Sequence, residues 1–270
     1  MNLRKCETME SVNYDNVADG YNKRYETAYK QDGIASELLH LVHLTKAQKV
    51  LEVGCGTGHW MEILQDYTTV VGIDLSYGML RKAAGSNKRK SLVRGDASKL
   101  PFADKTFDMV YCVNAVHHFL NPAAFITDAN RVIKPDGVLA VIGMNPHAEK
   151  DRWFIYDYFP GTREVDLQRY PSPEIIENWM VSVGFGKIAH KTAERLHNDR
   201  NSDNVFPLSK DFTSQLSLLS EEDYERGIAR IKAVLLEAKE NDQNVIFPVD
   251  ISLAMVTGWS MKRNSGKASS

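Results

Sequence analysis

The chain of 270 residues is 43% hydrophobic and 25% charged, the composition of an ordinary globular protein large enough for one sizeable domain. Its formal net charge of −2 gives no general attraction to polyanions, which argues against nucleic acid or an anionic membrane as a partner. Three cysteines without a C-x-x-C pair argue against a disulfide framework and against a zinc site.

The two ends of the sequence are polar. Residues 1–10 are too polar for a signal peptide, and no apolar run approaches the roughly 18 residues that cross a membrane. Residues 261–270 are small and polar, so we expect a disordered tail. With its unpaired cysteines, the chain is predicted to be cytoplasmic, without a membrane anchor or a metal centre.

Residues 34–144 alternate between helical and strand patterns. We expect helices at 34–44, 60–65, 77–84 and 122–133, and strands at 49–53, 69–74, 91–95, 107–113 and 137–143. Near-continuous apolar strands separated by helices indicate a parallel sheet buried on both faces. With right-handed crossovers, the predicted fold is a doubly wound α/β sheet.

The alternation loosens after residue 144. Residues 145–173 are rich in aromatics and have no clean period; a helix at 172–184 and a strand at 185–196 follow. A helix at 220–239 begins with a capping-box pattern, and a last strand is predicted at 250–259. We interpret 34–144 as the first half of one domain, 172–196 and 247–260 as its second half, and 145–171 and 197–246 as insertions.

Residues 50–60 read V-L-E-V-G-C-G-T-G-H-W, so a strand ends in three glycines, Gly54, Gly56 and Gly58. Ligands of parallel sheets lie beyond the carboxyl ends of the strands, and glycine lets a ligand approach the backbone. A tight turn alone would not need three glycines. The dinucleotide pattern G-x-G-x-x-G would place its third glycine at position 59, which is His59, so that pattern fails by one residue.

Two aspartates follow the next two strands. Asp74 ends V-V-G-I-D, where a carboxylate can accept hydrogen bonds from both ribose hydroxyls. Asp96 lies in G-D-A after the third strand, where it can face the amino edge of an adenine, and Ala97 leaves room for the ring. A cap or turn role for Asp96 is the alternative.

These segments, with F-D-M-V-Y-C-V-N-A-V-H-H-F and R-V-I-K-P-D-G, resemble the class I S-adenosylmethionine-dependent methyltransferases. The resemblance covers about residues 45–145 and is closest to the small-molecule group that includes the ubiquinone and menaquinone C-methyltransferases. It implies a Rossmann-like, mostly parallel seven-stranded sheet with an antiparallel last strand and helical lid insertions.

The resemblance also implies roles for matching residues. The three glycines would line the methionine and ribose parts of S-adenosylmethionine, Asp74 would bind the ribose, and Asp96 and Ala97 the adenine. The remaining implied cofactor-binding residues are Tyr21, Glu52, Leu75, Met79 and Asn114. Residues 1–33 would supply an amino-terminal lid helix, with Tyr14 and Tyr21 on one face.

Methyl transfer from a sulfonium is an in-line displacement that depends mainly on alignment and exclusion of water. No triad or metal is needed, and a base is needed only for an acceptor that must lose a proton. His117 and His118 are the candidate catalytic residues, with packing or cofactor contact as the alternative.

Aromatic and apolar residues of the insertions are the candidate pocket for a small organic acceptor. The predicted pocket residues are Tyr14, Trp153, Phe154, Tyr156, Tyr158, Phe159, Tyr224, Ile228 and Ile231. Packing of the insertions on themselves is the competing explanation.

Three other functions stay open at this point. A dinucleotide oxidoreductase would leave Asp96 unexplained, and a protein that binds S-adenosylmethionine without turnover would share every binding motif. A methyltransferase acting on RNA or protein is the third. The sequence does not specify the acceptor, its reacting atom or the oligomeric state.

Overall fold

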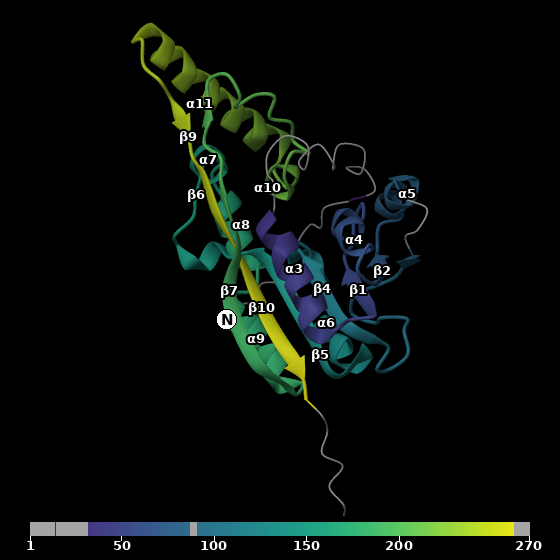
Figure 1. Ribbon diagram of the computed structural model, residues 1–270. Helices are drawn as coiled ribbons and strands as arrows, with labels where there is room; N and C mark the ends of the chain where they lie inside the picture. Colours follow the sequence, from purple (N-terminus) through teal and green to yellow (C-terminus); the bar gives the residue numbers. More distant parts are fainter. Residues whose placement is uncertain (1–13, 15–31, 87–90, 262–270) are drawn as a thin grey trace, which may run out of the picture.

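The computed structural model describes residue 14 and residues 32–86 and 91–261 (Figure 1). The predicted cofactor contact Tyr21, most of the predicted lid helix at 1–33 and residues 262–270 lie outside the described residues.

Within the described residues the main sheet has eight strands, in the order β3-β2-β1-β4-β5-β10-β6, with β7 also paired to β10. The five strands of the first half are β1 Lys49–Val53, β2 Thr69–Asp74, β3 Ser91–Arg94, β4 Phe107–Val113 and β5 Ile133–Met144. All pairings among these five are parallel.

The last strand reverses direction. β10 (Val249–Ser260) is antiparallel to both β5 and β7 (Phe185–His197), so β7 runs parallel to β5. The predicted doubly wound, mostly parallel sheet with an antiparallel last strand is therefore confirmed. The two-residue strand β6 (Arg152–Trp153), which pairs with the start of β10, adds an eighth strand to the predicted seven.

Helices cover both faces of the sheet. One face carries α3 Asp32–Thr45, α4 His59–Leu64 and α5 Tyr77–Ser86, and the other carries α6 Pro122–Val132 and α9 Pro173–Ser182. β4 shows why both faces are covered: Val110 and Cys112 join the core with α6 and α9, whereas Met109 and Tyr111 join the core with α3 and α4. Successive side chains of a strand point to opposite faces of the sheet, and in β4 nearly all of them are apolar, so the sheet is buried on both faces.

A smaller layer, here called the lid, consists of residues 145–171 and 198–248 and sits above the carboxyl edge of the sheet (Figure 1). The long strands β7 and β10 extend into it. Its helices are η2 Pro146–Ala148, α7 Phe154–Tyr158, α8 Thr162–Arg169, α10 Ser214–Ser217 and α11 Glu221–Glu240, and its short strands β8 Arg200–Asn201 and β9 Ile246–Phe247 pair with each other.

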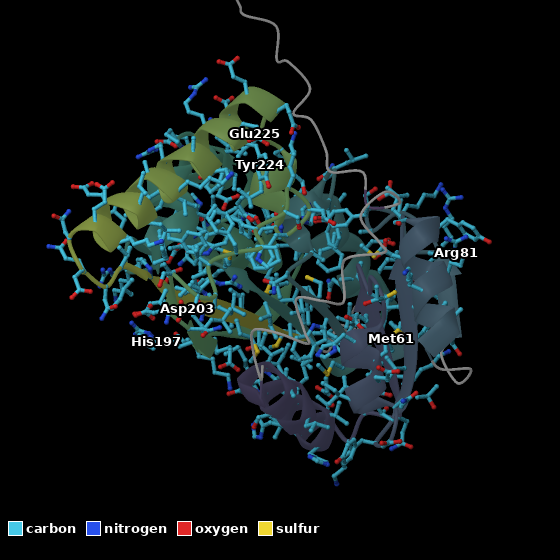
Figure 2. All side chains as sticks on the ribbon, turned by 90° about the horizontal axis from the view of Figure 1, so that it is seen from above. Met61, Arg81, His197, Asp203, Tyr224 and Glu225 are labelled. Carbon is cyan, nitrogen blue, oxygen red and sulfur yellow. The ribbon has the colours of Figure 1, made fainter. Side chains whose placement is uncertain are left out.

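The lid has its own apolar core, built from residues such as Phe154, Phe159, Leu216, Ile231 and Phe247. Its long helix α11 begins at a Ser220 cap, as the sequence predicts. Seen from above, Tyr224 and Glu225 of α11 lie on one side of the molecule, and Met61 and Arg81 lie on the opposite side (Figure 2).

Within the described residues, no helix combines the length and the apolarity needed to cross a bilayer.

Candidate functional site

The glycine loop that follows β1 is held in a left-handed backbone conformation. Gly54, Gly56 and Gly58 have φ angles of 73°, 53° and 78°, a region that side chains with a Cβ rarely adopt. A Cβ on Gly54 would also lie 2.5 Å from the Cβ of Ala115, the residue after Asn114 beyond β4. The loop is therefore packed directly against the segment that leaves the neighbouring strand.

Asp74, the last residue of β2, ties this loop to the next strand. Its Oδ2 accepts a hydrogen bond from the backbone N–H of Gly56 at 2.8 Å, and its Oδ1 accepts one from Ser76 at 2.9 Å. The half-buried carboxylate is thus fixed in orientation at the carboxyl edge of the sheet.

Glu52, in β1 just before the glycine loop, is 1% exposed. It accepts a hydrogen bond from the Tyr111 hydroxyl of β4 at 3.0 Å. Burial, with the adjacent Glu52 carboxylate as a second cause, raises the pKa of Tyr111 far above its ordinary value, so the hydroxyl stays a donor. Glu52 therefore joins β1 to β4 inside the core, two residues before the glycine loop begins.

The predicted adenine-binding residues lie beyond β2 and β3. Asp96 is exposed, and its Oδ1 accepts a hydrogen bond from the Ser98 backbone at 2.8 Å, which is the geometry of a turn residue. Ala97 and Met79 are buried, whereas Leu75 is 60% exposed. Asp96 is therefore a turn residue, and only its Oδ1 is used by the turn, so its Oδ2 can accept a hydrogen bond from another donor.

Asn114 follows β4 with a left-handed φ of 49°. Its side-chain oxygen is buried and has no hydrogen-bond partner among the described residues. A buried acceptor without a partner costs free energy, so such a group marks a place where a donor from outside the chain is expected. Asn114 also lines a cavity, which makes it the link between the glycine loop and that cavity.

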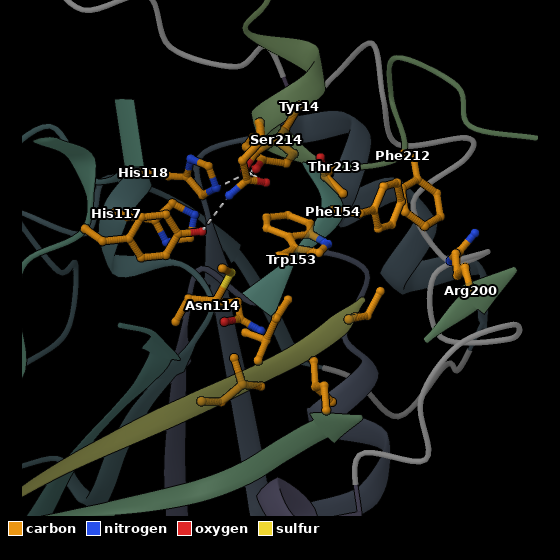
Figure 3. A pocket seen from close by; sticks show the side chains of 17 residues that line it. Tyr14, Asn114, His117, His118, Trp153, Phe154, Arg200, Phe212, Thr213 and Ser214 are labelled. Atoms are coloured by element: carbon orange, nitrogen blue, oxygen red, sulfur yellow. Dashed lines mark hydrogen bonds between the residues drawn. The ribbon is translucent and has the colours of Figure 1, made fainter. Parts of the chain in front are cut away.

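The cavity, of about 140 Å³, lies between the carboxyl edge of the sheet and the lid (Figure 3). Its lining consists of Tyr14, Asn114, His117, His118, Met144, Trp153, Phe154, Tyr170, Leu196, Arg200, Phe212, Thr213, Ser214, Gln215, Val249, Ile251 and Leu253.

Some predicted pocket residues line this cavity and others do not. Tyr14, Trp153 and Phe154 line it. Tyr156, Tyr158, Phe159, Tyr224, Ile228 and Ile231 belong instead to the lid core or its margin. The lid core thus uses most of the aromatics that the sequence pattern suggested for an acceptor, while polar residues of the segment 212–215 were missed because no motif surrounds them.

The two histidines, in the short helix η1 (Val116–His118), have different surroundings. His117 is buried and stacks on the Tyr170 ring, with centroids 3.8 Å apart and planes 17° apart. Burial, followed by the nearby His118 and Arg169, lowers the pKa of His117 well below its ordinary value. His118 is half-buried, and its Nε2 lies 2.5 Å from the Tyr14 hydroxyl. His117 is therefore a neutral packed ring, and His118 is the more accessible polar group.

A buried polar network in the lid contacts Tyr170: the Gln215 amide donates to the Tyr170 hydroxyl at 3.5 Å, and the Arg169 guanidinium lies 5.7 Å from the centre of its ring. Asp166 is fully buried and accepts hydrogen bonds from Gln215 at 2.7 Å and from Tyr156 at 2.8 Å. Burial raises the pKa of Asp166, and these two hydrogen bonds offset part of the effect. Arg169 lies 3.8 Å from the same carboxylate and donates to Ser214 at 3.1 Å. The network joins α8 to α10 and so shapes one wall of the cavity.

No three His, Cys, Asp or Glu side chains in the described part of the chain are placed to hold a metal ion.

Comparison with protein families gives one match: residues 51–141 fit the model of a family described as a methyltransferase domain. Among curated relatives, malonyl-[acyl-carrier protein] O-methyltransferase of Legionella pneumophila is 30% identical over 178 residues, or 62% of each chain. Demethylmenaquinone methyltransferase of Corynebacterium kroppenstedtii is 40% identical over 95 residues, covering 35% of this chain and 41% of the relative. The chain thus covers less than two thirds of these relatives' lengths.

Solved structures share the fold. A chain of Anabaena variabilis, provisionally described as a methyltransferase from an antibiotic biosynthesis pathway, superposes with a TM-score of 0.66 at 18% identity. The superposition covers 83% of this chain and 96% of that one.

Proposed function

Residues 51–141 of this chain are a methyltransferase domain, which confirms the resemblance to class I methyltransferases, and we propose that the protein transfers a methyl group from S-adenosylmethionine to a small organic acceptor. The family match supports the donor, whereas the acceptor is argued from the cavity. The proposal predicts that a binding site for the donor runs along the carboxyl edge of the sheet.

One observation carries the donor assignment: four neighbouring strands present their groups in a row. In the order β3-β2-β1-β4, the strand ends carry Asp96, Asp74, the glycine loop and Asn114. Adjacent strands lie about 4.8 Å apart, so the row is roughly 14 Å long. S-adenosylmethionine has its adenine, ribose, sulfonium and amino-acid parts in the same linear order.

The residues fit those parts by chemistry. The Asp96 carboxylate would accept a hydrogen bond from the adenine amino group, and the Asp74 carboxylate would accept from the ribose hydroxyls, because both follow neighbouring strands at this edge of the sheet. The unpartnered Asn114 oxygen needs a donor, which the ammonium of the amino-acid part would supply. A Cβ at Gly54 would collide with the Cβ of Ala115, so glycine at this position lets the loop pack against the residue that follows Asn114.

When bound, S-adenosylmethionine supplies a methyl group on a sulfonium: an electron pair of the acceptor forms the new bond to the methyl carbon, and the electrons of the broken C–S bond stay on sulfur, which leaves S-adenosylhomocysteine. The chain's part is to orient the acceptor and to exclude water. The lid and the apolar side chains of the cavity serve this role. Tyr14 and His118 form the polar pair nearest to the expected transfer centre, and we assign His117 to positioning because its lowered pKa makes it a weak base.

The cavity supports a small acceptor. It has about 140 Å³ of space under a lid with its own core, which suits a small molecule better than an RNA or protein segment.

The donor assignment is tested by calorimetric titration with S-adenosylhomocysteine and, separately, with NAD. Asp74→Ala removes a charged acceptor and Asn114→Gly removes an amide without straining a left-handed φ, so each should weaken S-adenosylhomocysteine at least tenfold. Asp203→Ala, in an exposed loop outside the row, is the matched control and should bind like the wild type.

Binding of NAD in preference to S-adenosylhomocysteine would overturn the donor assignment. Tight S-adenosylhomocysteine binding that both site variants retain would place the donor elsewhere. A protein that binds S-adenosylhomocysteine but methylates RNA or protein, and no small molecule, would show that the acceptor is not a small organic molecule.

A further inference from the structure

The cavity has a strongly uneven polarity. Eight of the seventeen residues that line it are apolar: Met144, Trp153, Phe154, Leu196, Phe212, Val249, Ile251 and Leu253. Among the described residues that line it, Arg200 alone carries a formally charged side chain at neutral pH. A single cation in an apolar enclosure favours a ligand with one negative charge, because the attraction is stronger where water is excluded.

Arg200 is held in place by contacts that leave its charge uncompensated. It is half-buried in β8, its Nη1 donates to the Asn204 carbonyl oxygen at 3.1 Å, and its guanidinium lies 4.9 Å from the centre of the Phe212 ring. No carboxylate of the described residues lies within 4.0 Å of it. A carbonyl and an aromatic face orient the guanidinium, and its remaining N–H donors suit a planar carboxylate.

The other end of the cavity is polar, and among the described lining residues it holds no Asp, Glu, Lys or Arg side chain. Figure 3 shows His117 and His118 at one side of the cavity, Arg200 at the opposite side, and Trp153 between them. Asn114, at the floor, adjoins the glycine loop through Ala115. The expected transfer centre and the cation are therefore at opposite ends of one cavity.

We propose that the acceptor is a small, mainly apolar acid whose carboxylate binds Arg200 and whose methyl-accepting atom lies at the His117–His118 end. This inference rests on the proposed methyl transfer for the role of that second end. A cavity of about 150 Å³ holds one benzene ring, so the apolar body of the acid is about the size of a single ring. The carboxylate selects the acid and sets the orientation that brings the other end to the donor.

The test compares acids with their neutral amides, which have nearly the same shape. Benzoate, phenylacetate and 3-phenylpropanoate are titrated calorimetrically beside benzamide, phenylacetamide and 3-phenylpropanamide, with and without saturating S-adenosylhomocysteine. The proteins are the wild type, Arg200→Gln, Arg200→Lys and Arg230→Gln. Arg230 is the matched control, since it also donates to a carbonyl, Tyr158 at 3.0 Å, and lies over a ring, 5.8 Å from its centre, but it does not line the cavity.

We expect the wild type to bind its best acid at least tenfold more tightly than the matching amide. Arg200→Gln should remove that preference by weakening the acid alone, Arg200→Lys should keep part of it, and Arg230→Gln should keep all of it. S-adenosylhomocysteine affinity should be the same in all four proteins.

Equal binding of acid and amide by the wild type, an acid preference that survives in Arg200→Gln, or binding of none of the six probes would each overturn the proposal. Failure of the proposed function would differ from these results. In that case S-adenosylhomocysteine would not bind the wild type, while the acid preference measured without it would still be decided by Arg200.

Discussion

Replacing Gly227 by alanine should destabilise the lid, although alanine is the better helix former. Gly227 lies in the interior of α11, and a Cβ there would be 2.1 Å and 2.2 Å from two ring carbons of Phe159. Phe159 is fully buried in the lid core, so its ring has no free space to enter. Overpacking of this kind costs about 1–3 kcal/mol, and the helix gains about 1 kcal/mol from alanine. Taking the upper part of that range, because ring atoms are involved, we expect a net loss of about 2 kcal/mol.

Gly85 in α5 provides the matched comparison, because a Cβ there meets nothing within 4 Å. Gly85→Ala should therefore raise the free energy of unfolding by about 0.5–1 kcal/mol, opposite in sign to Gly227→Ala. Urea unfolding followed by circular dichroism measures both. In a Phe159→Leu background, where the ring is absent, Gly227→Ala should lower the free energy of unfolding by less than it does in the wild type. A Gly227→Ala protein as stable as the wild type, or more stable, would refute the packing argument.

Three further outcomes follow from the described contacts. Burial in the folded protein keeps the pKa of His117 well below 6.5. Below pH 6.5 the unfolded chain therefore binds a proton at His117 that the folded chain does not bind. The free energy of unfolding should fall with falling pH by up to about 1.4 kcal/mol per pH unit from this group. His117→Phe should remove that part of the slope in urea unfolding at several pH values, and an unchanged slope would contradict it. Arg131→Lys should lower the free energy of unfolding by about 1–2 kcal/mol, because the guanidinium donates at once to both oxygens of Asp128, to Asp104 and to two backbone carbonyls. The control Arg81→Lys, at an exposed position, should leave the free energy of unfolding nearly unchanged in the same urea experiment. Tyr14→Phe should raise the KM of an identified acceptor and leave S-adenosylhomocysteine affinity nearly unchanged, because the lost hydroxyl pairs with His118 at the cavity. A change in S-adenosylhomocysteine affinity with no change in the acceptor KM would show that Tyr14 acts at the donor site.

The strands of the sheet could be predicted from the sequence because each of them is a short apolar run that is recognisable without its neighbours. β4 is apolar at almost every position, and the predicted bounds of β1, β2 and β4 agree with the structure. The glycine loop was equally readable, since left-handed φ angles at Gly54, Gly56 and Gly58 leave few alternatives to glycine.

The lid was less readable because its helices are short and its aromatics follow no period. α7 and α8 span five and eight residues, too few for a clear amphipathic pattern. An aromatic residue in the lid core and one at the cavity look alike in sequence: Phe154 reaches the cavity, whereas Phe159 is held in the core against Gly227. Arg200 carried no signal at all, because its position depends on the pairing of β8 with β9 and on the Phe212 ring.

A crystal structure of the protein with S-adenosylhomocysteine would show directly whether the donor lies along the carboxyl edge of the sheet. We predict the adenine beside Asp96 and Ala97, the ribose hydroxyls on Asp74, and the amino-acid ammonium on the Asn114 side-chain oxygen, with the sulfur facing the cavity. A ligand bound away from this edge, or lying along it in the reverse order, would contradict the assignment.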